Sequence, residues 1–288
     1  MFSGLRGDDV VVYAVENQTK IVVRIGPLAR TLVEQYRAEK MPKRYSTRRS
    51  YDSWLDNHIL PKWGENPITD LQARPVELWL ESLMLSSRSK SSIRGLLSAL
   101  LDYAMWRGDL PVQRNPMELV AVKNATKRTR QPHSLTVEDF QKFLRHLDES
   151  FRTISLVCVC FGLRISECLA LKWSDVDWLN WKLSVQRGIV RQRVDDVKTA
   201  YSQKAMSIDS TMLDVLKVWK QTSQFFTPDD WVFASPAHLG RLPWSADAVK
   251  DAYKKASLAA KIDHVSTHGM RHTYRSWLDA VGTSVANR

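Results

Sequence analysis

Residues 160–178 read CFGLRISECLALKWSDVDW, and the rest of the chain is best understood by working outward from this stretch. It continues an apolar run, ISLVCVCFGL, that we interpret as a buried helix. Arg164 follows that helix and begins another, with Glu167 one turn later on the same face. The pair is either an ordinary ion pair on a helix surface or an arginine that a carboxylate orients for chemistry.

Two later stretches add residues of matching chemistry. VKTAYSQKAMSI, residues 197–208, places Lys198 in a turn region between two expected strands. STHGMRHTYRSWL, residues 266–278, places His268 and Arg271 one helical turn apart. Residues three apart share a helix face, so this imidazole and guanidinium can point at one spot.

Two arginines, a lysine and a histidine that converge would describe a phosphate site. Phosphoryl transfer spreads negative charge over oxygens, and preorganised cations stabilise that charge. The planar fork of Arg164 or Arg271 can donate two parallel hydrogen bonds to phosphate oxygens. Lys198 can act as a general acid, and His268 can transfer a proton near neutral pH.

Simpler interpretations of the same residues remain open. Lys198 is also explained as a surface charge in a hairpin. His268 and His272 are four residues apart and could form half of a metal site, but no nearby Cys or Glu completes one. We therefore expect no metal. Cys158, Cys160 and Cys168 match no zinc or redox spacing, and we expect buried free thiols.

The charge balance favours a polyanionic partner. Lys and Arg total 42 against 31 Asp and Glu, a net charge of +11 and a pI near 9.6. Two basic clusters bracket one expected helical domain, which fits DNA binding better than a solvated surface. The expected DNA-binding residues are Lys43, Arg44, Arg48, Arg49, Lys123, Lys127, Arg128 and Arg130.

Composition predicts a folded chain without a membrane segment. Hydrophobic residues make up 44% and charged residues 25%, which excludes an entirely disordered chain. No apolar run approaches the roughly 20 residues that span a bilayer, and the N-terminus does not resemble a signal peptide. We expect a cytoplasmic protein.

The chain is expected to be mainly α-helical with a small antiparallel β-sheet. Two strands over 9–25 and a helix after Pro27 form an N-terminal extension, residues 1–43, of unknown role. Residues 44–122 show helical patterns, with Pro61 and Gly64 expected to end one helix and Gly108 another. A basic linker, 123–134, precedes a second domain, 135–288, which opens with a cap candidate at Thr136. Residues 181–208 alternate as short strands do.

With these motifs together, the chain resembles the tyrosine recombinases of the phage integrase family. GLRISECLALKWSDVD is similar to the first-arginine box of that family, KTAYSQKAMSI to its β-hairpin lysine segment, and HGMRHTY to its His-x-x-Arg box. The helical module before residue 122 resembles the core-binding domain. The resemblance covers about residues 45–288, and the motifs are specific in combination rather than singly.

The resemblance implies roles for the site residues and partners. Arg164 and Arg271 would clamp the scissile phosphate, Lys198 would be the general acid, His268 would assist proton transfer, and Glu167 would support Arg164. The implied partner is double-stranded DNA, with four protomers assembling on two sites and neither a metal nor a nucleotide cofactor required.

The family pattern continues beyond Arg271 with a further His or Trp and then the nucleophilic Tyr, and the sequence ends at Arg288 before both. Neither Tyr201 nor Tyr274 stands in the nucleophile position, so we expect the chain alone to bind DNA without cutting it. Two alternatives stay open. Either the residues are an incomplete sequence of an active integrase, or the chain is a DNA-binding regulator that keeps the phosphate pocket for docking.

Overall fold

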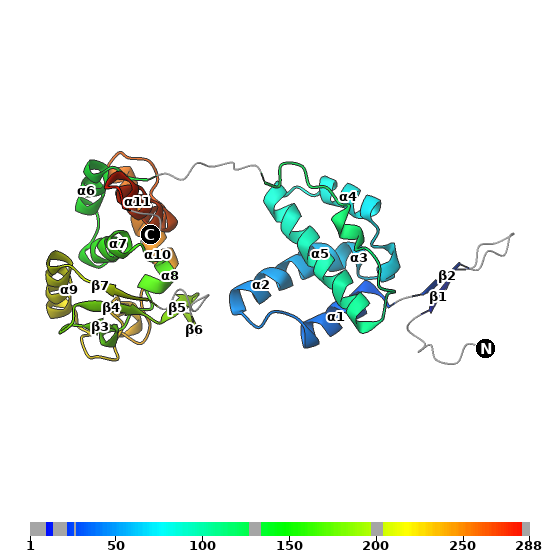
Figure 1. Cartoon of the computed structure of the whole chain (residues 1–288), viewed down its shortest axis with the longest axis horizontal. Helices are drawn as coiled ribbons and strands as arrows, with labels where there is room; N and C mark the ends of the chain where they lie inside the picture. Colours follow the sequence, from blue (N-terminus) through cyan, green and yellow to red (C-terminus); the bar gives the residue numbers. More distant parts are fainter. Residues whose placement is uncertain (1–9, 14–21, 26, 127–133, 197–203, 284–288) are drawn as a thin grey trace. The chain divides into compact units, whose positions relative to one another are not determined.

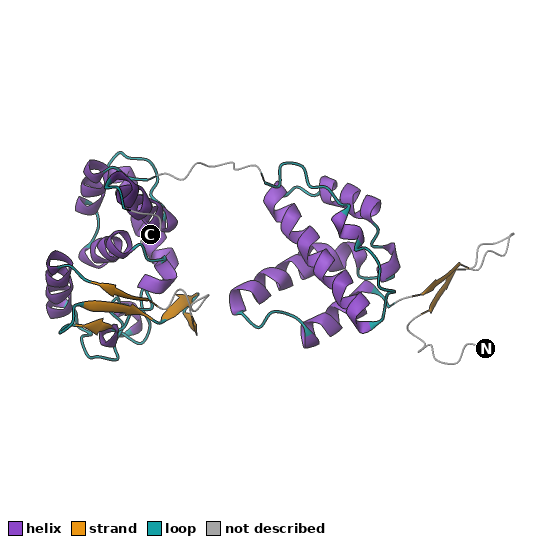
Figure 2. Cartoon of the chain, viewed as in Figure 1, coloured by secondary structure: helices purple, strands orange, loops and turns teal. Residues whose placement is uncertain are grey.

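The computed structural model describes residues 10–13, 22–25, 27–126, 134–196 and 204–283 (Figure 1). The chain divides into two compact units, Met1–Thr129 and Arg130–Arg288. Helices dominate both units, and the second also carries small antiparallel sheets (Figure 2). The fold class predicted from the sequence is confirmed. None of the described helices is long and apolar enough to cross a membrane.

The first unit begins with a hairpin and continues as a group of helices. Strands β1 (Val10–Tyr13) and β2 (Val22–Ile25) pair antiparallel, as their β-branched residues predict. Its helices are α1 (Ala29–Glu39), α2 (Tyr45–Trp54), α3 (Leu60–Trp63), α4 (Ala73–Ser82) and α5 (Ser87–Arg107), with 3-10 turns at Ile68–Asp70 and Pro116–Glu118.

Helix α5 supplies much of the core of this unit. Its apolar face is buried through Ile93, Leu97 and Leu100, and it ends where Gly108 adopts a left-handed φ of 87°. Helix α1 contributes Leu32 and Val33 to the same core. Because α1 lies within residues 1–43, part of the expected extension belongs to the folded unit. The sequence-based domain boundaries themselves stay predictions.

Pro61 and Gly64 were expected together to end the helix that begins near residue 45, and it does end at Gly64, the C-cap of α3. Pro61 itself does not stop it, because the helical path runs through the proline to Trp63. A π-helical turn, Leu55–Ile59, lies directly before α3. Proline lacks the N–H of an ordinary helical turn and its ring crowds the preceding carbonyls. The wider π turn relieves both conflicts, so Pro61 is accommodated inside the helical segment.

The second unit packs helices around a small three-stranded sheet. Strands β3 (Val176–Asp177), β4 (Lys182–Val185) and β7 (Lys204–Ser207) form that sheet in the order β3-β4-β7, and β5 (Arg187–Val190) pairs with β6 (Arg193–Asp196). All pairs are antiparallel, as predicted. The helices are α6 (Val137–Arg145), α7 (Glu149–Phe161), α8 (Ile165–Cys168), α9 (Ser210–Thr222), α10 (Ala246–Ala259) and α11 (Thr267–Ala280).

Helix α7 is the buried helix predicted from its apolar sequence. Ile154, Val157 and Cys158 have at most 1% of their surface exposed. The cap predicted at Thr136 is confirmed, since its hydroxyl accepts the Asp139 backbone N–H at 3.1 Å. One expectation for the cysteines is wrong. All three are free thiols, but Cys160 is exposed because it lies on the outer face of α7.

Candidate active site

The loop from α7 to α8 is the centre of the candidate site. Gly162 ends α7 with a left-handed φ of 61°. A Cβ at this position would overlap the ring of Tyr274, which comes from α11. Gly162 is therefore required both for its backbone conformation and for the close approach of α11. This contact brings residues about one hundred positions apart in the sequence to one place.

Glu167 holds Arg164 at two points. The backbone N–H of Arg164 donates to Glu167 Oε2 at 2.8 Å, and its Nη1 donates to Oε1 at 2.6 Å. The Glu167 side chain is only 9% exposed, whereas that of Arg164 is 42% exposed. A guanidinium has five N–H donors. The carboxylate therefore orients Arg164 and leaves donors available to an anion.

Arg271 reaches the same loop from α11. Its Nη1 donates to the carbonyl oxygen of Gly162 at 2.5 Å. Burial lowers the pKa of Arg271, and the positive charge of Arg164 lowers it further, while Glu167 opposes that effect. Arg271 thus contacts the loop two residues before Arg164, and the two positive charges disfavour each other. An anion placed between them would relieve that repulsion, which makes the loop a suitable phosphate site.

His268 occupies the first turn of α11 and is exposed. Its ring meets that of His272 edge-on, with the ring centroids 4.7 Å apart. Within the described part of the chain, no group of three or more His, Cys, Asp or Glu residues could hold a metal ion. His268 and Arg271 are three residues apart on one helix, as the sequence predicts.

Lys198 lies outside the described residues. Strand β6 ends at Asp196 and β7 begins at Lys204, so Lys198 falls in the segment between them. Its role stays a prediction.

Helix α11 is anchored on its other side to the start of the second unit. The backbone N–H of Leu135 donates to Thr273 Oγ1, and the Trp277 indole donates to the Leu135 carbonyl, each at 3.0 Å. The Trp277 ring also packs edge-on against Phe140 at 5.5 Å. These contacts fix the helix that carries His268 and Arg271.

The sequence analysis missed a second arginine–carboxylate pair close to the site. Arg187, the first residue of β5, donates through both Nη atoms to the Asp175 carboxylate at 2.6 and 3.1 Å. Asp175 also accepts the Lys172 backbone N–H at 2.8 Å and is 2% exposed at its side chain. Strand β5 packs on α8. The signal was the buried Asp in WSDVDW, but its partner could not be chosen from sequence.

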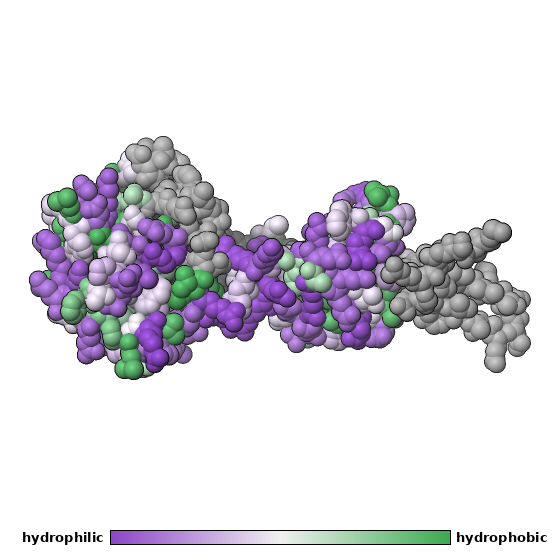
Figure 3. Space-filling view, turned by 90° about the horizontal axis from the view of Figure 1, so that it is seen from below, coloured by the Kyte–Doolittle hydropathy of each residue, from purple (hydrophilic) through white to green (hydrophobic). Residues whose placement is uncertain are grey.

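The predicted DNA-binding residues of the first unit fall in two places. Arg44 is the residue before α2, and the helix itself carries Arg48 and Arg49, both exposed. Helix α2 buries none of its residues, so one of its faces is open. Lys43 precedes it and is exposed. On the face that Figure 3 shows, hydrophilic residues cover most of the described surface of this unit.

Lys123 lies elsewhere, against the end of α4. Its amino group contacts Glu81 at 2.8 Å, and the pair is largely exposed. The backbone N–H of Ala121 donates to Glu77 at 2.8 Å, so this segment is held at two points. Three further predicted DNA-binding residues, Lys127, Arg128 and Arg130, lie outside the described residues.

A sequence profile of the phage integrase family matches residues 133–286. The chain belongs to the phage integrase family. The match covers α6 to α11 and every candidate catalytic residue. The recognition of a tyrosine recombinase from the sequence motifs is thereby confirmed.

Curated relatives and solved structures agree with this membership. The ICEBs1 integrase of Bacillus subtilis is 27% identical over 59% of this integrase-family chain and 48% of its own length. An integrase of Streptomyces ambofaciens is 26% identical over 78% of the chain and 62% of its own length. The chain thus spans about half to three fifths of these relatives.

The solved structures show the same fold. The Tn1549 transposon integrase, solved in complex with transposon right end DNA, superposes with a TM-score of 0.71 at 18% identity and covers 88% of this chain and 86% of that one. A lambda integrase tetramer bound to a Holliday junction superposes with a TM-score of 0.67 at 17% identity, covering 89% and 74%.

Proposed function

We propose that the chain binds double-stranded DNA and acts in site-specific DNA recombination, with Arg164 and Arg271 binding one backbone phosphate. One observation carries this proposal: Arg271 of α11 binds the Gly162 carbonyl of the same loop that ends at Arg164, where the Glu167 carboxylate orients Arg164. Two arginine forks match the non-bridging oxygens of a phosphodiester and stabilise the charge that develops there.

Proton transfer falls to the remaining predicted residues. His268 is exposed three positions before Arg271 and can pass a proton near neutral pH. Lys198 follows β6 in the sequence and would protonate the leaving 5′ oxygen when a nucleophile attacks the phosphorus. We assign no residue of this chain as that nucleophile, so the chain alone is expected to bind DNA without cutting it. This division of labour needs neither a metal nor a nucleotide cofactor, because the arginines supply the positive charge.

Affinity comes mainly from contacts to the DNA backbone. Lys43, Arg44, Arg48 and Arg49 gather around α2 and face phosphates, while the basic residues from Lys123 to Arg130 follow the chain into the second unit. Lys123 exchanges Glu81 for a phosphate when DNA binds. The protein acts in the cytoplasm and self-associates on DNA, in keeping with the tetrameric relative bound to a junction.

The test compares duplex-DNA binding by the full chain and by Arg164→Ala over a range of salt concentrations. Removing one phosphate contact is expected to weaken binding about tenfold and to reduce the salt slope by about one. Arg114→Ala is the matched control, because Arg114 is also an exposed arginine with a carboxylate partner on the next turn, Glu118. Equal losses for both variants would show that Arg164 contributes only general charge.

A further inference from the structure

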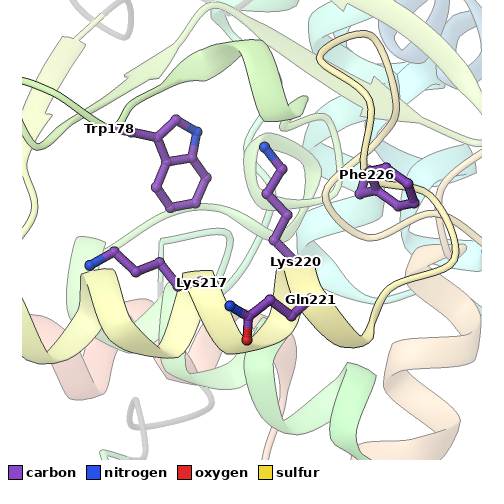
Figure 4. A pocket seen from close by; sticks show the side chains of 5 residues that line it. All are labelled: Trp178, Lys217, Lys220, Gln221 and Phe226. Atoms are coloured by element: carbon purple, nitrogen blue, oxygen red, sulfur yellow. The ribbon is translucent and has the colours of Figure 1, made fainter.

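An open hollow of the second unit lies on helix α9, apart from the arginine site. Its volume is about 430 Å³, and it is lined by Trp178, Lys217, Lys220, Gln221 and Phe226 (Figure 4). Helices α8 and α9 lie on different sides of the unit (Figure 1).

Two aromatic rings line this hollow, and one of them, Trp178, is held by a neighbouring ring. Trp178 stacks on the buried Trp173, with ring centroids 6.1 Å apart. The indole of Trp173 donates to the Phe225 carbonyl at 2.8 Å, and the Phe225 ring packs against Gly240. With Phe225 fixed inward, its neighbour Phe226 is directed outward and is 56% exposed. The contacts of Phe225 therefore account for the exposure of the Phe226 ring.

Positive charge lies between these rings. The amino group of Lys220 is 5.1 Å from the ring centroid of Trp178 and 5.5 Å from that of Trp173. Within the described part of the chain, no carboxylate forms a salt bridge with Lys220. Figure 4 shows this amino group between Trp178 and Phe226. Lys217, one turn earlier on α9, forms a salt bridge with the exposed Asp214 at 3.2 Å.

Gln221 completes the lining with a side-chain amide that both donates and accepts hydrogen bonds. The pocket thus offers flat aromatic surfaces, ammonium groups and one amide. Flat rings stack on a base, ammonium groups attract a phosphate, and an amide can pair with the edge of a base. A paired base inside a duplex has its faces covered by neighbours and cannot enter.

We propose that this α9 pocket binds an unpaired nucleotide, with its base against Phe226 and its phosphate beside Lys217 and Lys220. The ligand is either a free nucleotide or one unpaired residue of a single strand, since both present the same base and phosphate. The site acts independently of Arg164 and Arg271.

The test measures binding of AMP, adenosine, a short single-stranded oligonucleotide and the same strand in a duplex. All titrations use the full chain in the Arg164→Ala background, which removes the phosphate contact proposed above. Phe226→Ala is expected to weaken AMP binding about tenfold. Lys217→Ala and Lys220→Ala are each expected to weaken it about two- to fivefold at low salt, and adenosine should bind more weakly than AMP.

Two matched controls keep the test specific. Leu258→Ala removes an apolar side chain that is 72% exposed on α10. Lys250→Ala removes a lysine that pairs with Asp247 three residues earlier, as Lys217 does with Asp214. Neither should change AMP affinity, and Phe226→Ala should not change duplex binding.

The AMP and single-strand titrations distinguish a free nucleotide from an unpaired residue of a strand. Binding of AMP alone indicates a free nucleotide, and binding of the single strand with loss in Phe226→Ala indicates an unpaired residue of a strand. The proposal is overturned if neither binds at millimolar concentration, or if Phe226→Ala behaves as Leu258→Ala does. It is also overturned if an acidic peptide with an aromatic residue binds with the same variant dependence while nucleotides do not.

Discussion

Two arginine–carboxylate pairs of the second unit differ in how far the arginine is exposed. At the start of β5, the Asp175 carboxylate accepts hydrogen bonds from both Nη atoms of Arg187 and from a backbone N–H, and the Arg187 side chain is 21% exposed. At the α7–α8 loop, the Glu167 carboxylate accepts hydrogen bonds from one Nη atom and the backbone N–H of Arg164, whose side chain is 42% exposed. In the β5 region both Nη atoms of the arginine bind its carboxylate, whereas in the loop region one Nη atom does, and the more exposed arginine keeps donors for a ligand.

The difference follows from where each carboxylate obtains its other partners. Asp175 caps the turn that follows α8, so Arg187 completes a buried network. Glu167 caps α8 and orients Arg164 toward the surface, beside Arg271. We therefore expect the β5 pair to matter mainly for stability and the loop pair mainly for phosphate binding.

The largest expected effect is on the β5 pair. Asp175→Ala leaves the Arg187 guanidinium half-buried without its carboxylate and should lower the free energy of unfolding by about 3 kcal/mol. Arg164→Ala should lower it by about 1 kcal/mol, because one hydrogen bond is lost. Urea unfolding followed by circular dichroism measures both. Equal losses would remove the distinction between the two regions.

A smaller effect is expected at the glycine that joins the loop region to α11. Gly162→Ala should cost about 2 kcal/mol, from its left-handed φ and from the clash with Tyr274. Combining it with Tyr274→Ala removes the clash but keeps the backbone strain. The double variant should therefore lose less than the sum of the two single changes. Additive losses would show that the ring contact does not constrain position 162.

The smallest effect on stability is expected at the Lys123–Glu81 salt bridge of the first unit, which is more exposed than either arginine pair. The hydrogen bond and charge of Lys123 lower the pKa of the Glu81 carboxyl. The contribution of the Glu81–Lys123 pair to folding stability is therefore present above the ordinary carboxyl pKa, and it is lost as the pH falls through the lowered pKa of Glu81. NMR titration of Glu81 in Lys123→Ala should show its pKa raised toward the ordinary value. An unchanged pKa would mean that the pair does not form in solution.

Sequence reasoning succeeded where local patterns decide the structure. The apolar run of α7, the Thr136 cap and the left-handed Gly108 follow from periodicity and backbone preference. The motif order also singled out Arg164 and Arg271, which both lie at the α7–α8 loop. Their role in phosphate binding stays a prediction.

Sequence reasoning failed where the outcome depends on distant partners. Pro61 and Gly64 were expected together to end a helix, and Gly64 does, but no sequence pattern indicated the π turn before Pro61. Cys160 lies in an apolar run, but its helix face points outward. The Asp175–Arg187 pair joins separate elements, so neither residue reveals the other. Tyr274 is needed against Gly162 for the same reason.

The central claim, that Arg164 and Arg271 bind the same phosphate, is tested most directly by a double-mutant cycle on duplex-DNA affinity. Arg271→Gln removes the charge and keeps a donor for the Gly162 carbonyl, and Arg164→Ala removes the other guanidinium. If both arginines contact one phosphate, the two losses are coupled by about 1 kcal/mol, and the double variant binds better than additivity predicts. Strictly additive losses would contradict the account and place the two arginines on separate phosphates.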